Sequence, residues 1–447
     1  MHPVLNLIKD PIPSLIRKIA LPASVGTFFQ TMYSIVDTFY AGKISPEALS
    51  ALAKSFPIYF IIIAACIGVT VGGTSLIANS IGEGSKEKIL NYFSHTIIYG
   101  ILLSILVTFL GLNFSRDVFI LMGSTGEVVS LGLKYTKVIF FGSIIFILVV
   151  ALNSLLHADG DTKTYRNILI LSFFLNIILN PIFIFGFLFI PAMGITGIGI
   201  ATIVSQLIAL LILIIKILKN PRLVDFSIKY FYLKFNFLKN LFFQSAPITV
   251  ALLSFTVGNT IILVYVGIFG EYATAGYGSA TRFDQVLLLP VLGLNTAIIS
   301  IIAQNYGAKN FLRVKESYFK AIIYGFVIMI FSGLIVFLSA DKIVSIFSDN
   351  LNVIEFGAKY LKISAFIFPA YPIFFISNGF FMSLKKSENA MLSNMIRNIL
   401  LPLFAFYLVK SKNGGFNTFF WTYCFFNWFY VSSLFIFVIF YIRKNLN

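Results

Sequence analysis

An aspartate stands inside the first long apolar stretch of this sequence. Gln30, Tyr33 and Asp37 follow one another at intervals of three and four residues, so in a helix they would share one face. A carboxylate in a membrane span costs roughly 2.5 to 3.5 kcal/mol and as a rule faces protein or water and carries function. We therefore expect Asp37 to bind a proton or a cation inside the protein. The alternative is an interfacial Asp that pairs with Lys43 or Lys54.

Two asparagines recur four residues apart in the fifth apolar stretch. Asn176 and Asn180 would lie on one helix face, and Pro181 follows them directly. Because proline cannot donate to the helix ladder, it frees a carbonyl and is expected to bend the helix. Two amides, a free carbonyl and a nearby carboxylate would bind a proton-carrying water or a hard cation such as sodium. Alternatively, the asparagines only join helices by hydrogen bonds.

Other residues carry weaker signals. Pro22 and Pro247 fall inside apolar stretches, where they act either as hinges or as kinks fixed by packing. Asp284 is a second candidate carboxylate, for which a local pair with Arg282 is expected. We expect Arg397 to mark the cytoplasmic entrance of its span.

The sequence lacks the patterns of enzymes and cofactor sites. It holds no catalytic triad, phosphate-binding loop or metal-ligand cluster, and its three histidines show no ligand spacing. Residues 157–161 are interpreted as a solvated cytoplasmic turn. Cys66 and Cys424 lie inside apolar stretches, where a free thiol behaves as a small hydrophobic group. We expect no enzyme activity and no cofactor, and no metal other than sodium near Asp37.

The composition is that of a membrane protein. Of the 447 residues, 58% are hydrophobic and 11% charged, whereas soluble domains carry roughly 25% charged residues. Apolar runs of about 20 residues, each able to cross roughly 30 Å of hydrocarbon as a helix, recur along the whole chain. The expected spans are residues 19–41, 55–79, 93–113, 133–156, 166–189, 194–216, 241–266, 279–303, 320–338, 359–383, 391–410 and 415–441.

The net charge of +16 does not indicate nucleic-acid binding, because the basic residues lie in short stretches between apolar runs. One side of the expected topology holds roughly twice as many Lys and Arg as the other, which the positive-inside rule assigns to the cytoplasm. We expect both termini to be cytoplasmic, in the inner membrane of a bacterium or archaeon. No cleavable signal peptide is expected.

A shift of 225 residues aligns the two halves of the chain. It matches Pro22 with Pro247, residues 97–100 with 322–325 (both Ile-Ile-Tyr-Gly), and Asn153 with Asn378. The position that matches Asp37 is Ile262, so the chemistry of the halves differs.

This repeat predicts an all-α membrane protein of twelve helices. Residues 1–216 and 241–447 would form two six-helix lobes joined by a cytoplasmic linker, residues 217–240. An even number of spans per repeat relates the lobes by a pseudo-two-fold axis along the membrane normal. In transporters built this way, substrate sites lie near the midplane and the lobes rock to give alternating access.

The chain resembles the multidrug and toxic compound extrusion (MATE) family, and within it the DinF-like branch. The residues that carry the resemblance are Pro22 and Asp37, Gly82 and Gly307 after the second and eighth helices, Asn153, and the Asn-Pro pair of Asn180 and Pro181. The resemblance implies export of organic cations driven by proton or sodium entry. It also implies an amino-terminal site, to which Gln30, Tyr33, Asp37, Tyr135, Asn153, Asn176, Asn180 and Thr202 correspond.

Two departures from the family bear on this expectation. Related members carry a second Asp where this chain has Asn180, which puts a tight sodium site in doubt. Residues 252–255 hold no acid where the NorM-like branch has one, which favours the DinF-like branch.

The expected function is a monomeric antiporter in the bilayer that exports amphipathic cations in exchange for protons. Sodium coupling remains open, and the alternative is a flippase for lipid-linked intermediates, which would favour a basic cleft and more spans. A buried carboxyl favours its protonated form and a bound cation its ionised form, which gives the competition an antiporter needs. The expected coupling residues are Asp37, Asn176, Asn180, Tyr33 and Tyr135, the substrate residues Gln30, Asn153, Thr202 and Asn378, and the hinges Pro22, Pro247 and Pro181.

Overall fold

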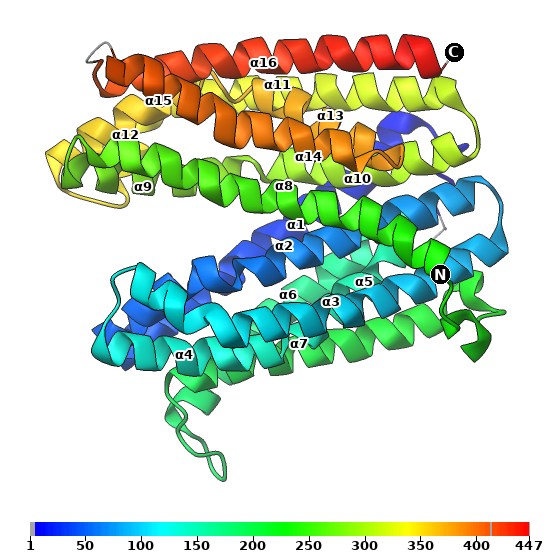
Figure 1. Cartoon of the computed structure of the whole chain (residues 1–447), viewed down its shortest axis with the longest axis horizontal. Coiled ribbons are helices and arrows are strands. Elements are labelled where there is room, and N and C mark those ends of the chain that lie inside the picture. Colours follow the sequence, from blue (N-terminus) through cyan, green and yellow to red (C-terminus); the bar gives the residue numbers. More distant parts are fainter. Residues whose placement is uncertain (1–4, 412–413, 447) are drawn as a thin grey trace. The chain divides into compact units, whose positions relative to one another are not determined.

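The computed structural model describes residues 5–411 and 414–446, and almost all of them lie in helices (Figure 1). The helices are α1 (Ile12–Ile44), α2 (Pro46–Gly82), α3 (Lys86–Leu121), α4 (Gly126–Phe141), α5 (Ser143–Ala158), α6 (Thr162–Phe185), α7 (Ile195–Leu218), α8 (Phe235–Gly267), α9 (Glu271–Leu287), α10 (Leu289–Gly307), α11 (Phe311–Ser345), α12 (Leu351–Ser364), α13 (Ala370–Ser383), α14 (Ser387–Met395), α15 (Leu401–Ser411) and α16 (Phe416–Asn445). A π-helical turn, Ile396–Leu400, joins α14 to α15, and short 3-10 turns lie at Pro221–Leu223 and Ile228–Phe231.

The helix boundaries repeat with the shift of 225 residues found in the sequence. Moved by that shift, α2 would span 271–307, which is the range that α9 and α10 cover together. In the same way α3 would span 311–346, and α11 runs from Phe311 to Ser345. The two halves of the chain therefore share one order of elements.

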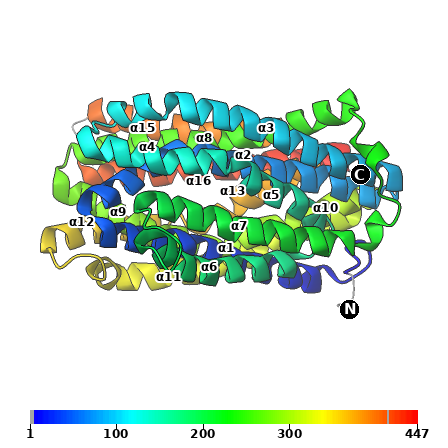
Figure 2. The same ribbon diagram turned by 90° about the horizontal axis from the view of Figure 1, so that it is seen from below.

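Ten helices of the described residues are long and apolar enough to cross a membrane. α4 and α5 together make an eleventh span, bent by 41° at Gly142. Their repeat counterparts, α12 and α13, are also separate helices, and they fill the place of the span expected at 359–383. The long helices run side by side within each unit described below (Figures 1 and 2).

The chain divides into two compact units, and two helices belong to both. Unit 1 holds residues 25–249, and unit 2 holds residues 6–24 and 250–447. Thus α1 passes from unit 2 to unit 1 two residues after Pro22, and α8 passes from unit 1 to unit 2 two residues after Pro247. The repeat therefore includes the points at which these helices change unit.

Two glycines let these shared helices pack closely. In unit 1, a Cβ added to Gly68 would lie 2.3 Å from Thr249 Oγ1. In unit 2, a Cβ added to Gly293, the repeat counterpart of Gly68, would lie 2.1 Å from Ser24 Oγ. Because van der Waals contact forbids such distances, both positions require glycine. The first half of α1 is thereby packed against α10, and the first half of α8 against α2.

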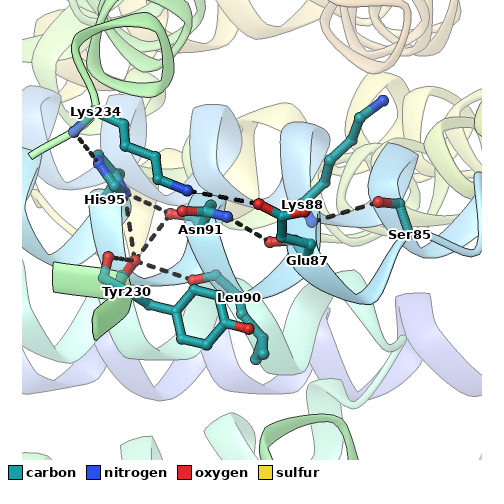
Figure 3. A network of polar contacts seen from close by, with 9 residues as sticks. Ser85, Glu87, Lys88, Leu90, Asn91, His95, Tyr230 and Lys234 are labelled. Atoms are coloured by element: carbon teal, nitrogen blue, oxygen red, sulfur yellow. Dashed lines mark hydrogen bonds and ion pairs between the residues drawn. The ribbon is translucent and has the colours of Figure 1, made fainter. Parts of the chain in front are cut away.

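The linker between α7 and α8 is bound to the first half of α3 (Figure 3). Lys234 donates its backbone N–H to His95 Nε2 at 2.9 Å and extends its ammonium to 3.5 Å from the carboxylate of Glu87. Ser94 donates to the carbonyl of Tyr230 at 2.6 Å. The aromatic rings of Phe93 and Phe226 meet edge to face. These contacts fix the linker to unit 1.

Residues 157–161 do not form the solvated turn that the sequence predicted. His157 is the penultimate residue of α5, and Asp161 caps the start of α6 by accepting the N–H of Thr164. Asp159 forms an ion pair with Arg222 of the linker and accepts the amide of Asn220 at 3.0 Å. Burial raises the pKa of Asp159, although Arg222 lowers it. The turn is thus a polar anchor for the linker.

The Asp159 side chain is 10% exposed, whereas that of Asp225, which pairs with Lys86, is 64% exposed. Since exposed ion pairs contribute little, Asp159→Asn should loosen the linker, and Asp225→Asn should leave it near the wild type. The measurement is the rate of trypsin cleavage at the basic linker residues in lipid nanodiscs. We expect several-fold faster cleavage in Asp159→Asn. Equal cleavage in both variants would show that Asp159 is not the anchor.

Candidate functional site

Asp37 is buried in unit 1, where three side chains donate hydrogen bonds to it. Asn176 Nδ2 lies 3.1 Å and Asn180 Nδ2 3.0 Å from its Oδ1. Thr202 Oγ1 lies 3.3 Å from its Oδ2. Asp37 is 7% exposed and lies on α1, and its three donors lie on α6 and α7. Three helices distant in sequence thus converge on one acid.

The i, i+4 spacing on α6 places both amides at the same carboxylate oxygen. Asn180 Nδ2 also donates to Asn176 Oδ1 at 3.0 Å, which fixes the two amides relative to each other. Asn180 Oδ1 has no hydrogen-bond partner among the described residues. A buried acceptor without a partner costs free energy, so this oxygen is available to a proton donor or a cation.

Pro181 does not end α6, which continues to Phe185. The proline leaves the carbonyl of Ile177 without its helical donor. The hydroxyl of Tyr40 donates to that carbonyl at 3.2 Å. The expected free carbonyl is therefore occupied by a side chain and does not serve as an ion ligand. Tyr40 was missed in the sequence, although it lies one helical turn after Asp37.

Tyrosines form the surroundings of the carboxylate. Tyr33 donates to the backbone carbonyl of Thr202 at 3.4 Å. Tyr33, Tyr59 and Tyr135 all interact electrostatically with Asp37. The rings of Tyr59 and Tyr135 lie 6.2 Å apart in an edge-to-face arrangement. Tyr59 was not predicted, because it lies on α2 with no polar neighbour to single it out.

Of the predicted amino-terminal site residues, the structure brings together Asp37, Asn176, Asn180, Thr202, Tyr33 and Tyr135. Gln30 is exposed, and no hydrogen bond joins it to Asp37 in the described part of the chain. Asn153 is fully buried on α5, where its amide lies 3.1 Å from His157 Nε2. Asn378 lies on α13 in unit 2, and neither atom of its buried amide has a partner among the described residues.

The lysines considered as alternative partners of Asp37 are engaged elsewhere. Lys54 donates to the carbonyl of Met122 at 3.3 Å, and the ammonium of Lys43 lies over the ring of Phe39. The reading of Asp37 as an interfacial residue paired with lysine is therefore wrong. Its partners are the neutral amides and the hydroxyl described above.

The acid of unit 2 has different surroundings. Asp284 is buried on α9, and its Oδ2 accepts the hydroxyl of Tyr360 at 2.7 Å. The expected pair with Arg282 is absent from the ion pairs of the described residues, because Arg282 is exposed whereas Asp284 is buried. Asp284 Oδ1 has no partner in the same set.

Within residues 5–411 and 414–446, no group of three or more His, Cys, Asp and Glu residues could hold a metal ion. At Asp37 a sodium ion would find one carboxylate and the free oxygen of Asn180, while hydrogen-bond donors already occupy both carboxylate oxygens. Hard cations prefer several oxygen ligands. The donor set therefore fits a proton better than a tightly held metal.

A bundle of long apolar helices that buries hydrogen-bonded carboxylates is typical of a polytopic membrane transporter. The family model of MatE matches residues 22–182 and 247–408. These ranges cover most of the chain and reproduce its repeat, so the protein belongs to the MATE family. It is a multi-pass membrane transporter rather than an enzyme.

Curated relatives span almost the same length. The chain is 26% identical to a FAD transporter of Shewanella oneidensis, over 89% of this chain and 88% of that protein. It is 27% identical to the multidrug export protein MepA of Staphylococcus aureus, over 88% and 86%. An outward-facing multidrug resistance MATE transporter of the MOP superfamily matches with a TM-score of 0.91 at 24% identity, over 99% of both chains. This match confirms the all-α fold of about twelve membrane helices.

Asn180→Asp should create a cation site. Two carboxylates within hydrogen-bond distance repel each other unless a proton or cation lies between them. We expect sodium affinity, measured by calorimetry on the purified protein, to rise several-fold or more. The control is Asn153→Asp, which adds the same charge in unit 1 but beside His157 rather than Asp37. Unchanged affinity in Asn180→Asp would contradict the geometry.

Proposed function

We propose that the protein is a proton-coupled antiporter that exports amphipathic organic cations by alternating access. The observation that carries this proposal is the buried carboxylate of Asp37, held by amide and hydroxyl groups without a counter-charge. A carboxyl in such surroundings binds either a proton or a cationic substrate, because each neutralises the same buried charge. Competition between the two couples their opposite movements.

Asn180 gives the site a means of accommodating both protonation states. The ionised carboxylate accepts from the NH₂ group of Asn180, while the amide oxygen has no partner. Rotation of that amide would present its oxygen to the proton of a neutral Asp37. The side chain thus serves as donor in one state and acceptor in the other.

Protons are favoured over sodium as the coupling ion. The site holds one carboxylate, and its nearest neutral ligands are hydrogen-bond donors in the arrangement described. Sodium would have to displace these donors and find further oxygen ligands. A proton requires only the rotation of the Asn180 amide and no further oxygen ligand.

The proposed movement uses the prolines of the shared helices. Pro22 and Pro247 interrupt the hydrogen-bond ladders of α1 and α8 two residues before each helix changes unit. A helix bends most easily where its ladder is broken. We propose these prolines as hinges for the lobes 1–216 and 241–447, with residues 217–240 as the cytoplasmic linker. Pro181 lies inside α6, and we assign it a smaller bend.

Several finer assignments complete the proposal. The acid in α1 and the lack of one in residues 252–255 support the DinF-like branch of the family. The distribution of Lys and Arg supports cytoplasmic termini in a bacterial or archaeal inner membrane.

We propose that the chain acts as a monomer, and that Gln30, Asn153 and Asn378 contact substrate during the cycle without binding Asp37.

Asp37→Asn should abolish proton-driven export while leaving the protein folded and inserted. The substitution keeps the shape of the side chain and removes the group that binds protons. The measurement is ethidium transport into inverted vesicles under an imposed pH difference. Asp225→Asn, which removes an exposed acid of unit 1 outside the site and should leave the linker near the wild type, serves as the control. Wild-type transport by Asp37→Asn would refute the assigned role.

The driving force should be the pH difference alone. With one carboxylate, the simplest cycle exchanges one proton for one monovalent cation, so no net charge crosses the membrane. The membrane potential, which supplies roughly 2.3 kcal/mol per 100 mV for each net charge moved, then contributes nothing. A pH difference of one unit then supplies about 1.4 kcal/mol, enough for about tenfold accumulation. Ethidium transport should stop when nigericin collapses the pH difference and continue when valinomycin with potassium collapses the voltage. The reverse pattern would require a further charge per cycle.

A further inference from the structure

A second buried charge lies in unit 2, far inside a membrane span. Arg397 is the eleventh residue of the segment Ser387–Ser411, about 15 Å from its start at about 1.5 Å per residue. It is 7% exposed and lies near the middle of the segment, not at the end of the span where the sequence indicated it. No ion pair of the described residues includes it, and its Nε has no hydrogen-bond partner among them. Intramembrane cations of this kind as a rule carry function.

Aromatic rings hold the guanidinium group. Its Cζ lies 4.4 Å from the ring centre of Phe374 and 5.0 Å from that of Tyr371. Cation–π contact with ring faces offsets part of the cost of burial. Arg397 also forms a side-chain hydrogen bond with Tyr371, and its buried Nε has no hydrogen-bond partner among the described residues. The N–H groups at the edge of a guanidinium plane match the two oxygens of a carboxylate. The ring contacts thus orient the cation and leave it without a negative partner.

The backbone around Arg397 departs from an α-helix. Residues Ile396–Leu400 form a π-helical turn, a feature that occurs frequently at functional sites. α8 supports this turn: Asn398 donates to Ser254 Oγ at 3.3 Å. A Cβ added to Gly258 would lie 1.9 Å from the carbonyl oxygen of Asn398. Close packing by α8 therefore holds the turn that carries Arg397.

A second polar side chain without a partner belongs to the same region. Asn427 on α16 is fully buried, and neither its amide oxygen nor its nitrogen has a hydrogen-bond partner among the described residues. Tyr430, one turn further along α16, donates to the carbonyl of Ser393, one turn before Arg397. This hydrogen bond joins α16 to the span that carries Arg397, and Asn427 lies one turn before Tyr430 on α16.

We propose that Arg397 and Asn427, with Tyr371 and Phe374, form a binding site for a monoanionic aromatic molecule such as an aryl carboxylate or sulfonate. The anionic group would accept from the guanidinium and the Asn427 amide, and its ring would stack with the aromatic side chains. Tyr371 is only partly buried, so its ring remains accessible. This site goes beyond the proposed function, which concerns cations at Asp37 in unit 1.

An ionised Asp284 would disfavour a ligand with two negative charges. Asp284 interacts electrostatically with Tyr371, the ring on which Arg397 stacks. A dianion would meet repulsion from this carboxylate, whereas a monoanion is neutralised by Arg397. Besides Arg397, the other titratable side chains that interact with Tyr371 or Asp284 are the tyrosines Tyr277, Tyr360 and Tyr423.

The test compares two ligands of the same shape and different charge. Binding of naphthalene-2-carboxylate and naphthalene-2-carboxamide is measured by calorimetry on the full chain in lipid nanodiscs of neutral lipid. We expect the carboxylate to bind at least about tenfold more tightly, since hydrogen bonds to charged groups are the stronger ones. Arg397→Gln should abolish this preference for the carboxylate over the carboxamide. Lys410→Gln, which removes an exposed cation of the same span, should retain the preference.

Further variants separate this site from the proposed function. Asp37→Asn should keep the preference for the carboxylate, because it alters only unit 1. Arg397→Lys retains the charge but loses the planar guanidinium group with its paired N–H donors, so it should show an intermediate preference for the carboxylate. If Arg397→Gln fails to fold, the test is the preference for the carboxylate over the carboxamide in the wild-type protein and in Asn427→Leu. Equal binding of both ligands to the wild type, or an unchanged preference in a folded Arg397→Gln or Asn427→Leu variant, would overturn the proposal.

Discussion

A charged carboxylate cannot remain in the interior of a membrane protein unless other groups satisfy its oxygens, and this requirement shapes unit 1 around Asp37. The acid on α1 needs donors from elsewhere, and α6 and α7 supply them through Asn176, Asn180 and Thr202. All of these partners are neutral. The stability of the site therefore depends on whether the carboxylate carries a proton or faces a cation, which is the property a coupled exporter uses.

The two halves of the chain share their architecture but not their chemistry. Their helices follow the same order at a spacing of 225 residues. The equivalent glycines Gly68 and Gly293 allow α8 and α1 to pack closely in units 1 and 2. Yet Ile262 stands where the repeat would place a second Asp37, and unit 2 instead buries Asp284 and Arg397. The two halves thus share the residues that helix packing requires, while each unit buries polar groups of its own.

The elements of the fold were largely predictable because hydropathy and the repeat are properties of the whole sequence. The cluster of Asp37 with Asn176 and Asn180 was also predictable, since an intramembrane acid and an i, i+4 amide pair need partners. Sequence spacing could not reveal that Tyr40 occupies the carbonyl freed by Pro181, nor that Gln30 is exposed. Those facts depend on the rotation of α1 and on contacts between helices distant in sequence. The depth of Arg397 was misjudged because the polar residues before it suggested a helix end.

The most direct test of the account is whether substrate binding releases a proton from Asp37. Calorimetric titration of the purified protein with tetraphenylphosphonium, repeated in buffers of different ionisation enthalpy, gives the number of protons released per cation bound. Under conditions in which the free site is protonated, the account predicts about one proton per cation for the wild type and none for Asp37→Asn. Binding without proton release by the wild type, or the same release by Asp37→Asn, would contradict exchange at this carboxylate.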